Sequence, residues 1–197
     1  MDFNLSPKQN EFLARKTNAE KAADIIRDAG GHVVGRTRLQ KTAYLLEIAG
    51  LGSGFFFEYR HYGPFSEGLA DAIEDAQLWD LITEEERQAD WGGFYSIYTA
   101  LKSDSLEDVK PARKQILDMG IHASAIEMEL AATAAFLKAA EDVPDPWAET
   151  AKRKPEKAAR CLANAKILYE KLRSVQTPKP LPRLSEHRET ANRGQIA

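Results

Sequence analysis

Apolar residues recur at helical spacing over much of this chain. Between residues 18 and 29 they fall on one face of a helix, and Gly30 and Gly31 follow. A second stripe runs through Leu39, Ala43 and Leu46 and is followed by Gly50. Because glycine readily adopts the left-handed conformation found at helix ends, this pattern predicts helices at 18–29 and 38–49.

Three segments carry the signature of a helix start. Ser6, Thr17 and Thr37 are each followed three residues later by Gln or Glu. In such a capping box the two side chains bond each other's backbone N–H groups. The sequence therefore predicts that separate helices begin near these three positions.

The pattern changes between the second and third predicted helices. Residues 55–62 are rich in aromatic side chains and partly alternate, which favours a strand, and Gly63-Pro64 is expected to break it. Helical spacing returns over 65–79. Two strand-like runs, 81–88 and 94–99, then flank a glycine-containing turn, which predicts a β-hairpin.

The remaining chain has a helical pattern. Helices are expected from Ser103 to about Met119, from Ser124 to about Glu141, and from Pro155 to Arg173. Pro144-Asp145-Pro146 predicts a rigid break, with Trp147 packing just beyond it. Residues 174–197 contain several prolines and few apolar residues, and they are predicted to be a disordered tail.

Together these elements predict an α+β fold that is predominantly helical. Three helices followed by a hairpin suggest a winged-helix-like core at about 18–100. The helices of 103–173 would pack against it, giving a single domain over residues 1–173.

Composition limits the possible functions. The 197 residues carry a net charge of −3, with 10 basic against 16 acidic residues in the first hundred positions. A dedicated nucleic-acid binder usually shows a basic excess. Cys161 is the single cysteine, so no internal disulfide can form. Without a long apolar run or a secretory signal, we expect a cytoplasmic protein with no membrane contact.

No residue pattern points to catalysis, a cofactor or a metal ion. Residues 30–37 resemble a phosphate-binding loop, but Arg36 stands where that motif requires lysine, and a helix precedes the loop. The four histidines are scattered without ligand spacing. We therefore expect no catalytic residue, no cofactor and no metal; a small enzyme of unknown type is kept as a third class of function.

The helix before the predicted hairpin is acidic. In a winged helix this element reads the major groove of DNA. Here it carries Glu67, Asp71, Glu74 and Asp75, and residues 64–79 contain no Lys or Arg. Such a surface would repel phosphates, which argues against DNA as the target, and a basic or hydrophobic protein partner fits better. A solvated face without any partner is the competing interpretation.

The predicted partner-binding region combines this helix with the segment before it. Gly63-Pro64 would set the angle of the acidic helix, and the aromatic run 55–62 would serve the core or an interface. The candidate contact residues are Tyr62, Gly63, Pro64, Glu67, Asp71 and Glu74.

Three segments resemble the Panacea-domain family, which includes SocA-like antitoxins and YwgA-like proteins. They are Thr37-Arg38-Leu39-Gln40-Lys41 with Tyr44-Leu45-Leu46, then Tyr62-Gly63-Pro64-Phe65-Ser66, and finally Asp145-Pro146-Trp147 with the helix over 165–172. The resemblance covers about residues 18–173. Two features depart from it: Thr42 stands where the family has an aliphatic residue, and the proline-containing tail has no counterpart.

The resemblance implies a mostly helical, cytoplasmic bacterial protein that binds another protein. In some family members the partner is a toxin, which is neutralised directly or delivered to a protease. It implies no catalytic residues. The alternative is a winged-helix transcription regulator that binds DNA through a basic surface outside the acidic helix, such as Lys152 to Arg160. The identity of the partner and the oligomeric state stay open.

Overall fold

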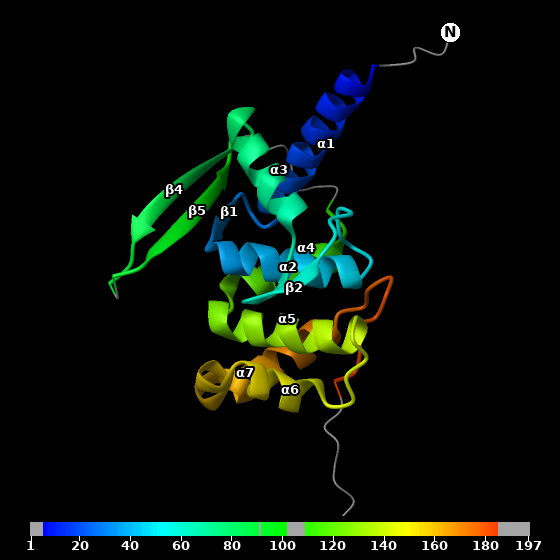
Figure 1. The fold of residues 1–197 in the computed structure, drawn as a ribbon, viewed down its shortest axis with the longest axis vertical. Helices are drawn as coiled ribbons and strands as arrows, with labels where there is room; N and C mark the ends of the chain where they lie inside the picture. Colours follow the sequence, from blue (N-terminus) through cyan, green and yellow to red (C-terminus); the bar gives the residue numbers. More distant parts are fainter. Residues whose placement is uncertain (1–5, 91, 102–108, 185–197) are drawn as a thin grey trace, which may run out of the picture.

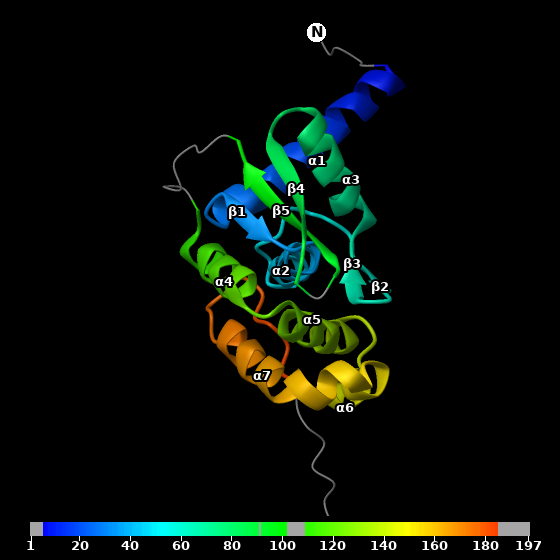
Figure 2. The ribbon, with the colours of Figure 1, turned by 90° about the vertical axis from the view of Figure 1, so that its left-hand side faces the viewer.

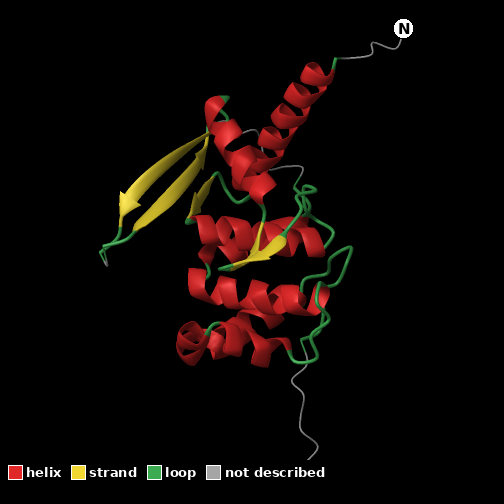
Figure 3. Cartoon of the chain, in the orientation of Figure 1, coloured by secondary structure: helices red, strands yellow, loops and turns green. Residues whose placement is uncertain are grey.

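The computed structural model describes residues 6–90, 92–101 and 109–184. Helices and short strands alternate in its first half, and helices make up its second half (Figures 1 and 3). In chain order the elements are α1 (Pro7–Asp28), β1 (His32–Val34), α2 (Arg36–Ile48), β2 (Glu58–Arg60), β3 (Gly63–Phe65), α3 (Glu67–Leu78), β4 (Ile82–Gln88), β5 (Phe94–Ala100), α4 (Pro111–His122), α5 (Ala125–Ala139), α6 (Pro146–Arg153) and α7 (Pro155–Arg173). The predicted predominantly helical α+β class is confirmed.

A three-stranded antiparallel sheet adjoins α1 and α3. Its order is β1-β5-β4, with His32 opposite Thr99 and Ile82 opposite Ala100. The predicted hairpin of β4 and β5 is confirmed, and it projects away from the helices as a wing (Figure 1). Strand β1 is absent from the elements predicted above, because three residues give too short a pattern to reveal a pairing partner 65 positions away.

Helices α2, α5 and the pair α6–α7 are stacked below the sheet (Figure 2). Helix α5 lies in the middle, and its residues from Met128 to Leu137 are all buried. A helix that is buried all round is mostly apolar, which the alanine-rich sequence of α5 provides; Glu129 and Thr133 are the buried polar residues of this stretch. One hydrophobic core joins both halves of the chain. None of the described helices is long and apolar enough to cross a membrane.

Helices begin near two of the three predicted starts, Ser6 and Thr37, but only one of the three predicted capping boxes is present. The Ser6 N–H donates to Gln9 Oε1 at 2.8 Å, and the Gln9 N–H donates to Ser6 Oγ at 3.4 Å, so this capping box forms. The start predicted at Thr17 is wrong, because α1 runs unbroken from Pro7 to Asp28. Backbone N–H groups inside a continuous helix already have carbonyl partners, and a cap there has nothing to satisfy.

The capping box predicted at Thr37 is also wrong. Helix α2 begins at Arg36 after Gly35, and no side chain caps it. Gln40 instead makes a tertiary contact: its Oε1 accepts from the Ser66 N–H at 2.9 Å, and its Nε2 donates to the Ser66 carbonyl at 3.0 Å.

The aromatic run forms less strand than predicted. Only Glu58–Arg60 is a strand, because the N–H groups of Ser53, Gly54 and Phe55 donate to Glu47 Oε1 at 2.8–3.0 Å and hold the preceding segment in a loop. The strand ends at Arg60, shortly before the break predicted at Gly63-Pro64, but Gly63-Pro64 itself lies in a second strand. It begins β3, which pairs with β2 across a turn at residues 61–62.

The C-terminal helices differ in detail from their prediction. Helix α4 begins at Pro111, and most of the expected earlier part lies in 102–108, outside the described residues. Helix α6, which follows the Pro144–Pro146 break, was not predicted as a separate element. The buried position of Trp147 and the start of α7 at Pro155 are confirmed.

The disorder predicted for the tail is wrong for residues 174–184. Leu181 and Leu184 are buried in the core, and the Lys179 N–H donates to the Ala49 carbonyl at 3.0 Å. The Tyr169 hydroxyl donates to the Pro182 carbonyl at 2.8 Å. Prolines restrict this segment to an extended shape, which lowers the entropy lost when two leucines anchor it. Residues 185–197 lie outside the described part.

Candidate partner-binding surfaces

The predicted contact residues fall on two separate surfaces. Tyr62 lies exposed in the turn of the β2–β3 hairpin, whereas Gly63 and Pro64 are buried behind it. Glu67, Asp71 and Glu74 are exposed on α3, which begins just after β3. An ion pair between Arg60 and Glu67, at 3.2 Å, links the hairpin to the first turn of that helix.

Helix α2 holds the hairpin from one side. Lys41 is 1% exposed, and its Nζ donates to the Pro64 carbonyl at 2.7 Å. Burial lowers the pKa of this ammonium to about 8. Because the neighbouring Gln40 binds Ser66, two successive side chains of α2 fix the two residues that flank Phe65.

Helix α5 approaches the hairpin closely at Gly63. The backbone φ of Gly63 is 86°, and a Cβ at this position would lie 2.4 Å from Thr133 Oγ1. The Thr133 hydroxyl is buried and has no hydrogen-bond partner among the described residues. Glycine is therefore required here for both its conformation and its size. Gly63 and Pro64 position the hairpin, and of the three predicted residues only Tyr62 is accessible.

A second group of charges holds the hairpin turn. Glu129 on α5 is 3% exposed and accepts from the ammonium groups of Lys154 and Lys157, each at 2.8 Å. Lys154 also donates to the His61 carbonyl at 3.1 Å, and the Lys157 Nζ lies 4.8 Å from the centre of the Tyr62 ring. An open pocket of about 240 Å³ lies beside this cluster. The single carboxylate of Glu129 offsets only part of the positive charge of the two lysines.

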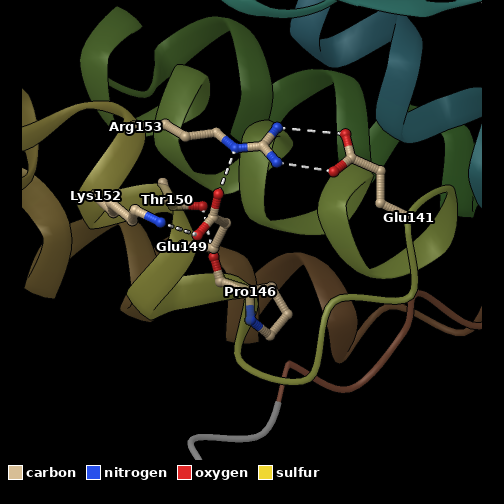
Figure 4. Close-up of polar contacts among 6 residues, drawn as sticks. All are labelled: Glu141, Pro146, Glu149, Thr150, Lys152 and Arg153. Atoms are coloured by element: carbon tan, nitrogen blue, oxygen red, sulfur yellow. Dashed lines mark hydrogen bonds and ion pairs between the residues drawn. The ribbon is translucent and has the colours of Figure 1, made fainter.

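Most cations of the basic run at 152–160 also lie within ion-pair distance of carboxylates of the same chain, whereas Arg160 stays exposed. Arg153 bonds Glu141 at 2.9 Å and Glu149 at 2.8 Å, and Lys152 lies 3.8 Å from Glu149 (Figure 4). The two carboxylates raise the pKa of the Arg153 guanidinium. With Lys154 and Lys157 bound to Glu129, less of this positive charge is left to attract phosphates.

Helix α3 is less negative than its sequence suggests. Asp75 is buried against Arg15 of α1, with Nε 3.0 Å from Oδ2, and the hydrogen bonds from Arg15 lower the pKa of its carboxyl group. Glu67 is paired with Arg60. Asp71 and Glu74 remain exposed, and neither forms an ion pair within the described ranges.

Two carboxylates of the β4–β5 wing are also paired with arginines. Arg36 at the start of α2 lies 3.4 Å from Glu84, and Arg87 pairs with Glu85 at 2.8 Å. Of the arginines that neutralise α3 and the wing, three come from other elements of the chain: Arg15, Arg36 and Arg60. Their roles were missed because no local spacing in the sequence shows which distant carboxylate an arginine will meet.

The first two segments that resemble Panacea-domain proteins contact each other directly, through Lys41 and Pro64 and through Gln40 and Ser66. The third segment packs elsewhere: the rings of Trp147 and Tyr169 meet edge to face, with centres 6.0 Å apart. Within the described residues, no group of three or more His, Cys, Asp or Glu side chains could hold a metal ion.

No protein family, curated protein or solved structure matches this chain. The resemblance to Panacea-domain proteins therefore stays a prediction. The function has to be argued from the surfaces themselves.

Proposed function

We propose that this chain is a non-catalytic protein-binding module, an antitoxin or proteolytic adaptor of the Panacea type that binds a partner toxin in the bacterial cytoplasm. One observation carries the proposal. Helix α3 directly precedes the β4–β5 hairpin, as the DNA-reading helix of a winged helix precedes its wing, yet it presents the exposed carboxylates Asp71 and Glu74 and no cation of its own. Such a surface attracts a basic protein and repels phosphates.

The state of the basic run supports a protein partner over DNA. A winged-helix regulator with an acidic α3 would need another cationic surface, and residues 152–160 were its best source. Lys152, Arg153, Lys154 and Lys157 are all within ion-pair distance of carboxylates of the same chain. If Lys154 and Lys157 bound phosphates instead, the carboxylate of Glu129 would be buried without a partner, which is strongly unfavourable.

The anchoring of the hairpin also supports a binding role. Lys154, which is held by Glu129, donates to the His61 carbonyl before the turn, and Lys41 and Gln40 bond the backbone of Pro64 and Ser66 after it. The surface that leads into α3 is thus formed before any partner arrives. Preformed surfaces avoid the entropy cost of ordering upon binding.

The test is co-expression with the product of the neighbouring reading frame. We expect that product to arrest growth alone, and this chain to bind it and restore growth. Asp71→Lys combined with Glu74→Lys should abolish rescue. The matched control, Glu86→Lys with Asp118→Lys, changes the charge equally at exposed sites elsewhere and should rescue normally.

Two results would overturn this assignment. The first is tight, saturable binding of the purified chain to duplex DNA at physiological salt. The second is failure of the folded wild-type chain to bind the neighbouring gene product.

A further inference from the structure

Helices α1 and α3 lie side by side and run in opposite directions, and the first part of α1 extends away from the rest of the fold (Figures 1 and 2). Near one end of the pair, the ring of Phe12 meets that of Trp79, with centres 5.8 Å apart. In the middle, Arg15 bonds Asp75.

The seam between the two helices is hollowed along its length. Two open pockets of about 340 Å³ each lie on it, and both are lined by Arg15 and Asp75. They therefore form one groove that the ion pair crosses. We call this the α1–α3 groove and define it by Phe12, Arg15, Asp71, Glu74, Leu78 and Trp79.

One end of the groove is apolar and exposed. Phe12 is 57% exposed and Leu78 is 74% exposed, and both lie beside the partly buried Trp79. Three large apolar side chains that meet at the surface mark an interaction site more often than scattered single ones do. Aromatic side chains in particular contribute much of the binding energy at protein interfaces.

The rest of the groove is negative. Arg15 and Asp75 neutralise each other, which leaves Glu11, Asp71 and Glu74 against Lys8 among the charged lining residues. A binding segment must therefore offer apolar groups at one end and positive charge along its length. Two adjacent helices also present a furrow that can receive a third helix.

From these features we propose that the α1–α3 groove binds a basic, amphipathic helical segment of a protein partner. Its apolar side chains would contact Phe12 and Leu78, and its cations would face Asp71 and Glu74. This inference rests on the proposed protein-binding function and adds the place and the chemistry of the contact. It also assigns part of that contact to α1, which lies outside the predicted contact residues.

A second copy of this chain fits the groove less well. A symmetric dimer brings the same patch of both subunits together. Two net-negative grooves would then face each other, and like charges across an interface are unfavourable. Charge complementarity thus favours a cationic partner.

The test uses the full chain and two synthetic 18-residue peptides of Leu and Lys or of Leu and Glu, with Leu at helical spacing in both. Fluorescence anisotropy should show binding of the cationic peptide only, weakened by added salt. Asp71→Asn with Glu74→Gln should weaken it about tenfold. Leu78→Ser should also weaken it. Glu86→Gln with Asp118→Asn, the matched control, should change it less than about twofold.

Three outcomes would overturn the inference: no binding of the cationic peptide, equal binding of both peptides, or equal binding by the wild type and the folded groove variants. Light scattering that shows a wild-type dimer dissociated by Leu78→Ser would assign the groove to a second copy and overturn it as well. The co-expression assay separates the two proposals. If the Asp71→Asn, Glu74→Gln variant still rescues growth, the groove is rejected as the contact site but the protein-binding function stands. The peptide experiment tests the groove without any toxin.

Discussion

The Cα atom of Gly63 lies against the hydroxyl group of Thr133, so close that a Cβ on Gly63 would be 2.4 Å from Thr133 Oγ1. Gly120 and Thr42 repeat this arrangement between α4 and α2, with a corresponding distance of 2.3 Å. In both pairs the threonine hydroxyl is buried and has no hydrogen-bond partner in the described part of the chain. In each pair the glycine lets two backbones approach closely, and the threonine hydroxyl between them is left without a hydrogen bond, which is unfavourable.

Gly63→Ala should destabilise the protein by about 2–4 kcal/mol, because it combines an unfavourable positive φ with a steric clash. The matched control is Gly54→Ala. Gly54 has a φ of 89°, close to the 86° of Gly63, but a Cβ there meets nothing within 4 Å. This control should cost only about 1 kcal/mol. Urea denaturation measures both, and equal losses would contradict the clash.

Thr133→Ala should remove most of the penalty at position 63. Without Oγ1, the nearest Thr133 atom to a Cβ on residue 63 is its own Cβ, at 3.6 Å. In the Thr133→Ala background, Gly63→Ala should therefore cost about 1 kcal/mol, as Gly54→Ala does. Thr133→Ala alone should be nearly neutral or stabilising, because it deletes an unpaired hydroxyl. Additive losses in the double-mutant cycle would refute the arrangement.

Lys41 should make stability increase with pH in the alkaline range. Its pKa is about 8 in the folded protein and 10.5 in an unfolded chain. Between these values the unfolded state binds the additional proton, so the free energy of unfolding rises with pH. Across this window the rise amounts to up to about 3 kcal/mol.

Lys41→Met keeps the length of the side chain and removes its titration. Urea denaturation from pH 7 to pH 10 should show the wild type gaining stability relative to this variant. Burial raises the pKa values of Tyr44 and Tyr169, but both tyrosines are present in both proteins and their effects cancel. Parallel pH profiles of the two proteins would show that Lys41 is not the group responsible.

Leu181→Ala should cost about 2–4 kcal/mol, because it leaves a cavity in the core that the segment 174–184 completes. Arg183→Ala, two residues away and exposed, serves as the control and should change stability by less than about 0.5 kcal/mol. Thermal unfolding followed by circular dichroism gives both values. Similar melting temperatures for Leu181→Ala and the wild type would mean that the segment is not part of the core.

Local patterns in the sequence were sufficient for the strongly periodic elements. The stripe of α7 and the hairpin of β4 and β5 were predicted because each is set by residues close in sequence. Errors arose where tertiary contacts replaced local ones. Gln40 binds Ser66 rather than the start of its own helix, and Leu181 is buried although its surroundings have the composition of a disordered tail.

The candidate surface was predicted only in part. The exposure of Asp71 and Glu74 followed from the spacing of one helix. The contribution of Phe12 and the neutralisation of Asp75 by Arg15 depend on how α1 lies against α3, 60 residues away. No spacing within either helix reveals that juxtaposition, so the groove could be recognised only from the structure.

Residues 174–184 pack back against the end of α2, so the core can be completed only late in synthesis. Lys179 bonds Ala49, and Leu181 and Leu184 complete a core whose other members lie as far back as Ala19. The ribosome must therefore release residue 184 before that core can close, while both helices of the α1–α3 groove emerge about a hundred residues earlier. The two helices that line the groove are therefore synthesised well before the leucines that complete the core on which they pack.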